Sequence, residues 1–130
     1  MDETARRSLA ARNHGSGYTC SQAVYCAFRD VTGISEPDAR AKAMPYSGGR
    51  KIKCGALCAA ELVIDDLAGK ISADGRDPDE MKALLEKRFA EKRGSVNCRE
   101  IRAGGYKNCR ASVEDAAGLL ESLLRENEMI

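Results

Sequence analysis

The chain has 130 residues, which suits one domain and leaves no room for a second core of ordinary size. Its 21 Lys and Arg residues and 20 Asp and Glu residues give a formal net charge of +1, which argues against a bulk electrostatic hold on nucleic acid or on an anionic membrane. Aromatic residues make up 5% and Trp is absent, so a base-stacking surface is not expected. We therefore expect residues 1–130 to form a single domain with neither nucleic acid nor membrane as a partner.

The composition predicts an all-α fold. Ala is abundant, β-branched residues are few, and no segment alternates apolar and polar residues as a half-buried strand would. The expected architecture is a compact bundle of about five helices plus a short helical turn. The predicted segments, in chain order, are helices at 3–13, 20–31, 35–44, 54–68 and 77–94, a turn at 98–101, and a last helix that holds its apolar residues between 113 and 124 toward the core.

Several helix boundaries are marked by capping residues. Thr19 suits the N-cap of the second helix, and the Ser35–Asp38 spacing is typical of a capping box. The segment Asp77–Glu80 combines an N-cap, a proline in the first helical turn and acids near the positive end of the helix dipole. Gly69 is expected to end the helix that begins near residue 54.

The predicted compartment is the cytoplasm. No apolar run reaches the ~20 residues of a membrane span, and the first twelve residues lack the apolar region of a signal peptide. Structural disulfides are rare in the cytoplasm, where grouped cysteines more often bind metal or carry redox chemistry. The six cysteines are therefore the feature that calls for a function.

Four cysteines fall at predicted helix starts: Cys20, Cys54, Cys98 and Cys109. Free backbone N–H groups and the helix dipole stabilise a thiolate there, and the thiolate is both the nucleophile of disulfide exchange and the form that binds metal. Two bland alternatives stay open. Any one cysteine can be a small buried apolar residue, and a last helix starting at Ser112 would leave Cys109 in a loop.

The other two cysteines, Cys26 and Cys58, fall inside predicted helices. Cys54 and Cys58 are one turn apart and share a face, so Cys58 is either a packing residue or an auxiliary thiol. No Cys-x2-Cys pair exists, and the lone His14 suits a surface or capping role better than a ligand. The sequence does not choose among disulfide pairings.

Cys54 is expected to be the most reactive thiol if the site holds no metal. Arg50, Lys51 and Lys53 precede it, and these cations together with a helix start predict a pKa near or below ~7. Cys26 is expected to react slowest, since nothing beside it favours the thiolate.

Two weaker patterns lie close by. Ser47-Gly48-Gly49 could form an anion-binding nest, although two glycines are little support for one. The acids Glu61, Asp65 and Asp66 fit a solvated helix face better than a catalytic carboxylate pair.

The segments Cys20-Ser21-Gln22-Ala23-Val24, Gly48-Gly49, Cys54-Gly55-Ala56, Cys98-Arg99-Glu100 and Cys109 agree in order and spacing with a known pattern. With them the chain resembles the C_GCAxxG_C_C family, named as putative redox-active proteins. The likeness runs from about Gly17 to Ala117. It implies a small helical prokaryotic protein in which Cys20, Cys54, Cys98 and Cys109 are the shared cysteines.

The chain departs from the family pattern at two places. The closing glycine of the Cys-Gly-Ala-x-x-Gly motif is Ala59 here, and Cys26 and Cys58 are additional to the shared four. A related module in split-Soret cytochromes is associated with an iron–sulfur site, so the resemblance also admits a bound cluster.

Three functional hypotheses follow. In the first, Cys20, Cys54, Cys98 and Cys109 meet at one site and act as a thiol–disulfide or electron-transfer centre, a thiol–disulfide oxidoreductase with Cys58 as auxiliary thiol. In the second, the same four cysteines hold an iron–sulfur cluster or zinc. In the third, the cysteines are buried structural residues. The first two imply a redox partner protein met in a small, transient encounter.

Overall fold

The predicted all-α class is confirmed. The computed structural model describes residues 3–47, 52–103 and 106–130, and strands are absent from these residues apart from one isolated pairing between Lys53 and Asn97. The described part of the chain forms these helices: α1 (Glu3–Gly15), α2 (Cys20–Cys26), α3 (Arg29–Thr32), α4 (Glu36–Ala43), the 3-10 helix η1 (Met44–Tyr46), α5 (Gly55–Asp66), α6 (Ala68–Ala73), α7 (Pro78–Arg93), α8 (Cys98–Arg102) and α9 (Tyr106–Glu126). None of the helices in this part of the chain is long and apolar enough to cross a membrane.

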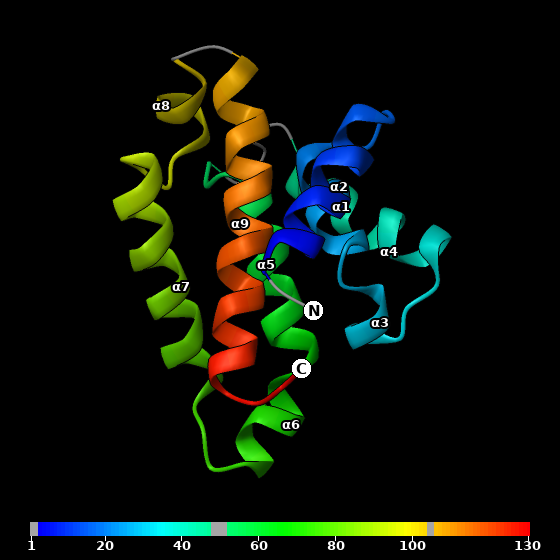
Figure 1. Cartoon of the computed structure of the whole chain (residues 1–130), viewed down its shortest axis with the longest axis vertical. Helices are drawn as coiled ribbons and strands as arrows, with labels where there is room; N and C mark the ends of the chain where they lie inside the picture. Colours follow the sequence, from blue (N-terminus) through cyan, green and yellow to red (C-terminus); the bar gives the residue numbers. More distant parts are fainter. Residues whose placement is uncertain (1–2, 48–51, 104–105) are drawn as a thin grey trace.

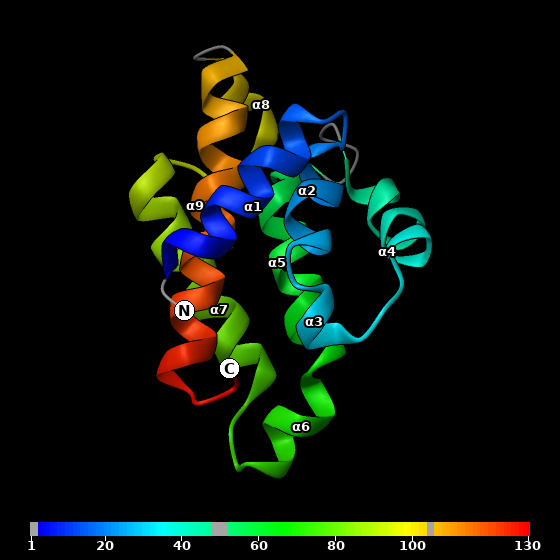
Figure 2. The same cartoon turned by 45° about the vertical axis from the view of Figure 1, so that its right-hand side comes forward.

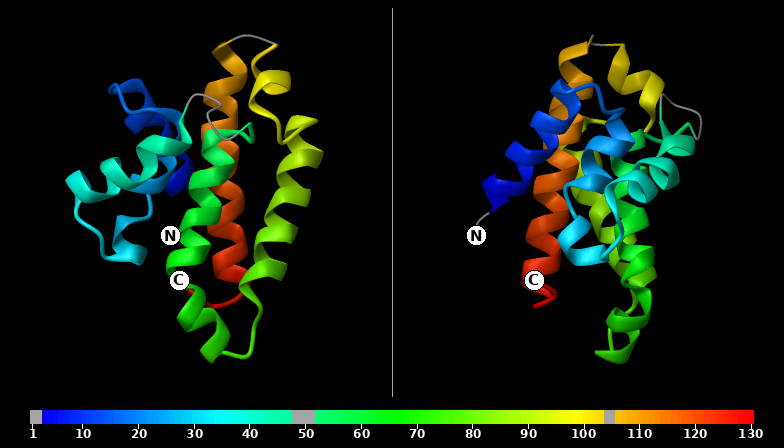
Figure 3. Two further views of the ribbon diagram at one scale, coloured as in Figure 1. Left: turned by 180° about the vertical axis from the view of Figure 1, so that it is seen from behind. Right: turned by 90° about the vertical axis from the view of Figure 1, so that its right-hand side faces the viewer.

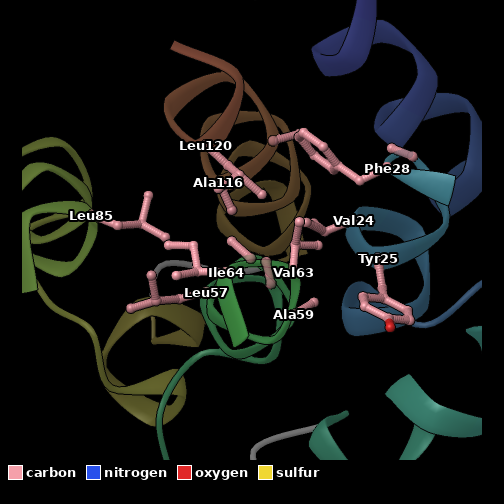
Figure 4. Packing of buried hydrophobic residues seen from close by; sticks show 14 of the residues in the cluster. Val24, Tyr25, Phe28, Leu57, Ala59, Val63, Ile64, Leu85, Ala116 and Leu120 are labelled. Atoms are coloured by element: carbon pink, nitrogen blue, oxygen red, sulfur yellow. The ribbon is translucent and has the colours of Figure 1, made fainter. Parts of the chain in front are cut away.

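The long helices α5, α7 and α9 run along the length of the molecule, and α1 crosses α9 (Figures 1 and 3). Helix α2 packs on α5 from the side away from α7. Figure 4 shows Ile64 of α5 facing Leu85 of α7, with Leu120 of α9 close by and Val24 of α2 on the other side. All four side chains are fully buried, and they belong to one apolar cluster that joins these helices.

The predicted helix at 20–31 is two helices, because the chain breaks at Ala27 and Phe28. The carbonyl of Ala27 accepts a hydrogen bond from Nη1 of Arg6, 3.1 Å away, instead of one from the next turn. Phe28 has a non-helical backbone, its ring is fully buried, and the Arg6 guanidinium lies 4.8 Å from the ring centre. A residue of α1 therefore contacts the backbone and the side chain at this break, which no local pattern predicts.

The predicted end at Gly69 of the helix that begins near residue 54 is wrong. Helix α5 stops at Asp66, and the backbone of Leu67 turns the chain into α6, which contains Gly69. The capping predictions had mixed outcomes. Thr19 forms a full capping box with Gln22, and Asp77 caps α7 through the N–H of Asp79, but Ser35 makes no side-chain capping bond.

The last helix begins at Tyr106, so Cys109 lies in its first turn and not in a loop. Its predicted apolar face is confirmed, since Val113, Ala116 and Leu120 are fully buried. On α7 the spacing also predicts burial of Leu84, yet this side chain is 38% exposed.

The arrangement of helix starts bears directly on the cysteines. Helices α2, α5, α8 and α9 all begin in the upper part of the molecule as drawn in Figure 1, and the turned view in Figure 2 places them there again. The fold thus gathers at one end the four helix starts that carry Cys20, Cys54, Cys98 and Cys109.

Candidate functional site

A short antiparallel pairing joins the segments that lead into Cys54 and Cys98. The N–H of Cys54 donates to the carbonyl of Val96 at 2.7 Å, and the N–H of Cys98 donates to the carbonyl of Ile52 at 2.8 Å. These bonds flank the pairing of Lys53 with Asn97. Because side chains alternate along extended backbone, Cys54 and Cys98 leave one face of the pairing and Lys53 leaves the other. Both cysteines are buried.

Cys20 lies against the first turn of α5. An ideal Cβ built on Gly55 would be 2.6 Å from Sγ of Cys20 and 2.6 Å from the carbonyl oxygen of Tyr46. These distances are too short for any side chain at position 55. A glycine is therefore needed there for Cys20 to approach the first turn of α5. The motif glycine therefore seats the Cys20 thiol directly beside Cys54.

Cys58 belongs to the same group. Its N–H donates to the Cys54 carbonyl at 2.9 Å, and it follows Gly55 by three residues, so both lie on the helix face that Cys20 touches. The thiols of Cys20 and Cys98 raise the pKa of Cys54 electrostatically, and the thiol of Cys20 does the same to Cys58. Cys20, Cys54, Cys58 and Cys98 are thus neighbours.

The remaining two cysteines differ from this group. Cys109 is half-buried in the first turn of α9, and its membership in the site stays a prediction. Cys26 is the last residue of α2 and is buried, with Arg29, Glu36 and Arg40 as its charged neighbours.

The predicted lowering of the pKa of Cys54 is wrong. Burial raises the pKa of this thiol to about 12 and outweighs the N–H groups of Leu57 and Ala56, which lower it. The helix start acts in the predicted direction but is the smaller effect, because a thiolate loses its hydration when it is buried. Arg50 and Lys51, which are also predicted to lower the pKa of Cys54, lie outside the described residues.

The ammonium of Lys53 is paired with carboxylates and not with the Cys54 thiol. Its ammonium lies 2.9 Å from Glu61 and 2.7 Å from Glu86. Lys53 lowers the pKa of Cys58 instead, although burial, the largest cause, raises the pKa of Cys58 to about 11.

The acids predicted to be a solvated face are in ion pairs. Besides the pair of Glu61 with Lys53, Asp65 bonds Lys82 at 2.8 Å and Asp66 bonds Lys42 at 2.5 Å. Asp66 also accepts a hydrogen bond from the buried Tyr25 hydroxyl. These contacts tie α5 to its neighbours, which the sequence pattern does not reveal.

A buried hydroxyl cluster beside Cys20 is a further feature that the sequence does not reveal. Ser47 bonds the hydroxyls of Thr19 and Ser21, each at 2.7 Å, and Ser21 also donates to the Ala43 carbonyl at 2.8 Å. This cluster fixes the segment after η1 against the start of α2. Gly48 and Gly49 of the predicted nest lie outside the described residues.

The thiols also bear on the hypothesis of an iron–sulfur cluster or zinc. Thiolates suit both groups chemically. Within residues 3–47, 52–103 and 106–130, however, no three Cys, His, Asp or Glu side chains are arranged so that they could hold one metal ion.

The fold and the site define a small all-helical protein with cysteines grouped at helix N-termini. The chain belongs to the C_GCAxxG_C_C family, described as "Putative redox-active protein (C_GCAxxG_C_C)", whose model matches residues 18–123. No curated protein and no solved structure matches the chain. The family supports a redox role in general terms. Ala59, in place of the motif's closing glycine, is fully buried on α5.

Proposed function

We propose that the protein is a thiol–disulfide redox protein in which Cys20 and Cys54 form a reversible disulfide. The observation that carries this is the position of the Cys20 thiol on Gly55, next to Cys54. All six cysteines are free in this structure, so each thiol is a candidate for exchange. The membership in a redox-active family supports the same assignment.

The reaction is a two-electron exchange. A thiolate of the protein attacks an external disulfide, a mixed disulfide forms and one partner thiolate leaves. A second protein thiolate then attacks the mixed disulfide and displaces the other partner thiolate. The protein loses two electrons and two protons to gain one S–S bond, and the external disulfide becomes two thiols.

Three other thiols extend this pair. Cys54 and Cys98 follow the paired residues Lys53 and Asn97, and Cys98 is an electrostatic neighbour of Cys54, so Cys98 is the candidate to accept the disulfide from Cys54 by internal exchange. Cys58 and Cys109 complete the set, Cys58 as the auxiliary thiol and Cys109 as the fourth family cysteine. We propose a redox partner protein in a reducing compartment such as the cytoplasm as the source of the external disulfide.

Disulfide mapping tests this proposal. The reduced chain is oxidised with diamide without unfolding, remaining thiols are alkylated, and peptides are read by mass spectrometry. We expect a Cys20–Cys54 disulfide that dithiothreitol reverses, and Cys20→Ser should remove it. Cys26→Ser, the matched control, should leave it intact. A fully alkylated chain with no Cys20–Cys54 link would contradict the proposal.

Metal analysis separates the other hypothesis. The protein is purified without oxygen and assayed for iron, sulfide and zinc. The thiol–disulfide proposal expects less than stoichiometric metal and titratable thiols. Stoichiometric iron with sulfide, or zinc, lost in Cys54→Ser would replace it with the cluster or zinc hypothesis.

A further inference from the structure

An open groove of about 520 Å³ lies between α5 and α7, lined on one side by Cys58. Glu61, Leu62 and Asp65 of α5 line the same side, and residues of α7 line the other. Cys58 itself is 9% exposed, so the groove is its access to solvent. Cys54, the N-cap residue of α5, is not among the residues that line it.

The charges of the groove are arranged in two bridges. Lys53 lies between Glu61 and Glu86, at 2.9 and 2.7 Å. Lys82 lies between Asp65 and Asp79, at 2.8 and 3.6 Å. Each lysine is shared by two carboxylates, so neither ammonium is left for an incoming anion. Four carboxylates against two lysines give the lining a net charge of −2.

A second thiol lies close to the cysteine that lines the groove. Cys58 stands on the face of α5 that Cys20 touches, since it follows Gly55 by three residues, and Cys20 is an electrostatic neighbour of Cys58. The thiol that lines the groove, Cys58, therefore has a second thiol, Cys20, near it. This is the arrangement that thiol–disulfide exchange needs, one sulfur to be reached from outside and one to complete the reaction.

We propose that Cys58 is the entry thiol of the protein, and that the α5–α7 groove selects external disulfides that carry positive charge next to their sulfur atoms. This inference rests on the proposed thiol–disulfide function and names its substrate class. The expected natural partner is a disulfide whose cysteines are flanked by Lys or Arg. Ammonium and guanidinium groups are attracted by the excess carboxylates, whereas anionic disulfides are repelled.

Each step of the exchange forms one S–S bond and breaks one. The Cys58 thiolate attacks one sulfur of the external disulfide, a Cys58 mixed disulfide forms, and the first partner thiolate leaves and takes up a proton. The Cys20 thiolate then attacks Sγ of Cys58, the Cys20–Cys58 bond forms, and the second partner thiolate leaves. Exchange with Cys54 passes the disulfide to the Cys20–Cys54 pair and returns Cys58 to a thiol.

Three small disulfides of different charge test the selectivity. The reduced chain is mixed at one pH and low salt with cystamine, with bis(2-hydroxyethyl) disulfide or with dithiodiglycolate, which are cationic, neutral and anionic. Loss of free Cys58 is followed by quenched alkylation and mass spectrometry, and each rate is divided by that of 2-mercaptoethanol with the same disulfide. We expect cystamine to exceed dithiodiglycolate by about fivefold or more, and high salt to reduce the ratio.

Variants then assign the selectivity to the groove. Glu86→Gln together with Asp65→Asn should bring the ratio close to one, while Glu126→Gln on another surface should leave it unchanged. Equal normalised rates for the three disulfides would overturn the inference, and so would a ratio that survives both groove substitutions. Circular dichroism of each variant confirms that it is folded.

The outcome is distinguishable from failure of the proposed function. If the Cys20–Cys54 disulfide forms but Cys58 shows no charge preference, the entry-thiol inference is wrong and the redox function stands. If no internal disulfide forms with any of the three reagents, the proposed function itself is wrong, and the inference falls with it.

Discussion

The Sγ atom of Cys20 lies 2.6 Å from the point that a Cβ atom would occupy at Gly55. The same point is 2.6 Å from the carbonyl oxygen of Tyr46, so backbone as well as side chain fills the space. Gly55 has no positive φ, and its role is close approach rather than turn formation. Gly55, the glycine of the Cys-Gly-Ala motif, thus lets the Cys20 thiol approach the start of α5, next to Cys54 in the chain.

Gly55→Ala tests this role. The added methyl group must displace Cys20 or the Tyr46 backbone, so we expect a loss of roughly 1–3 kcal/mol of unfolding free energy. We also expect less Cys20–Cys54 disulfide after mild oxidation. Urea unfolding and disulfide mapping measure the two effects.

Gly69→Ala is the matched control, because this glycine lies in α6 with nothing within 4 Å of its added Cβ. It should be neutral, or stabilising by up to about 1 kcal/mol through helix propensity. Equal effects of the two substitutions would show that Gly55 has no packing role.

Alkylation of two of the cysteines should become faster as the pH rises toward 11 or 12. Burial raises the pKa of Cys54 to about 12 and that of Cys58 to about 11, from an ordinary value of 9.0. We expect both to be alkylated slowly at pH 8 in the folded chain and quickly in urea. Competitive alkylation across pH, read by mass spectrometry, gives each apparent pKa.

The same shifts predict alkaline instability. A thiol whose pKa is raised by folding stays protonated in the folded state while its unfolded counterpart ionises. Its contribution to stability is fully present below pH 9 and is lost as the pH rises toward 11 or 12. Cys54→Ser should flatten this part of the stability curve, and an unchanged slope would show that the thiol is not buried as described.

What the sequence reveals of this fold is mostly local. Asp77 and Asn97 each cap the helix that directly follows them. The starts of α7 and α8 are therefore marked by a few consecutive residues. At the break in the helix predicted at 20–31, the Ala27 carbonyl is bonded by Arg6, which is 21 residues away. Such a contact has no signature in the sequence beside the break.

The candidate site shows the same division. The family cysteines and their positions at helix starts follow from sequence, because caps and spacing are local. The direction of the Cys54 pKa shift does not, because it depends on how deeply distant helices cover the thiol. The pairing of Lys53 with Glu86 does not follow from the sequence either, because Glu86 belongs to α7. Charged neighbours in sequence are therefore a poor guide to the field at a buried thiol.

A buried ion pair is expected to stabilise the contact between α1 and α9. Glu121 is fully buried, with Arg125 at 2.8 Å and Nε of Arg6 at 3.4 Å. Glu121→Gln leaves the buried Arg6 side chain with less compensation, so we expect a loss on the order of 3 kcal/mol in urea unfolding.

Glu126→Gln is the control for this substitution. Glu126 pairs with Arg88 at 2.8 Å on the exposed surface, where such pairs contribute less than about 1 kcal/mol. If both substitutions cost the same, the interior pair does not carry the stability assigned to it.

The last prediction concerns Asn97, which holds Cys98 in place. Its side-chain oxygen accepts hydrogen bonds from the N–H groups of Arg99 at 2.9 Å and Glu100 at 3.4 Å, and its backbone pairs with Lys53. Asn97→Ala removes the cap, which costs about 1 kcal/mol, and loosens the start of α8. Because Cys98 is the first residue of α8, its alkylation rate should rise at the same time.

Ser35→Ala provides the comparison, since Ser35 occupies the N-cap position of α4 without a side-chain capping bond. We expect it to change the unfolding free energy by less than about 0.5 kcal/mol and to leave Cys98 alkylation unchanged. A rise in Cys98 alkylation in Asn97→Ala, at a denaturant concentration where Ser35→Ala shows none, would assign the effect to the cap. If Cys98 reacts at the same rate in both variants, the cap does not control access to this thiol.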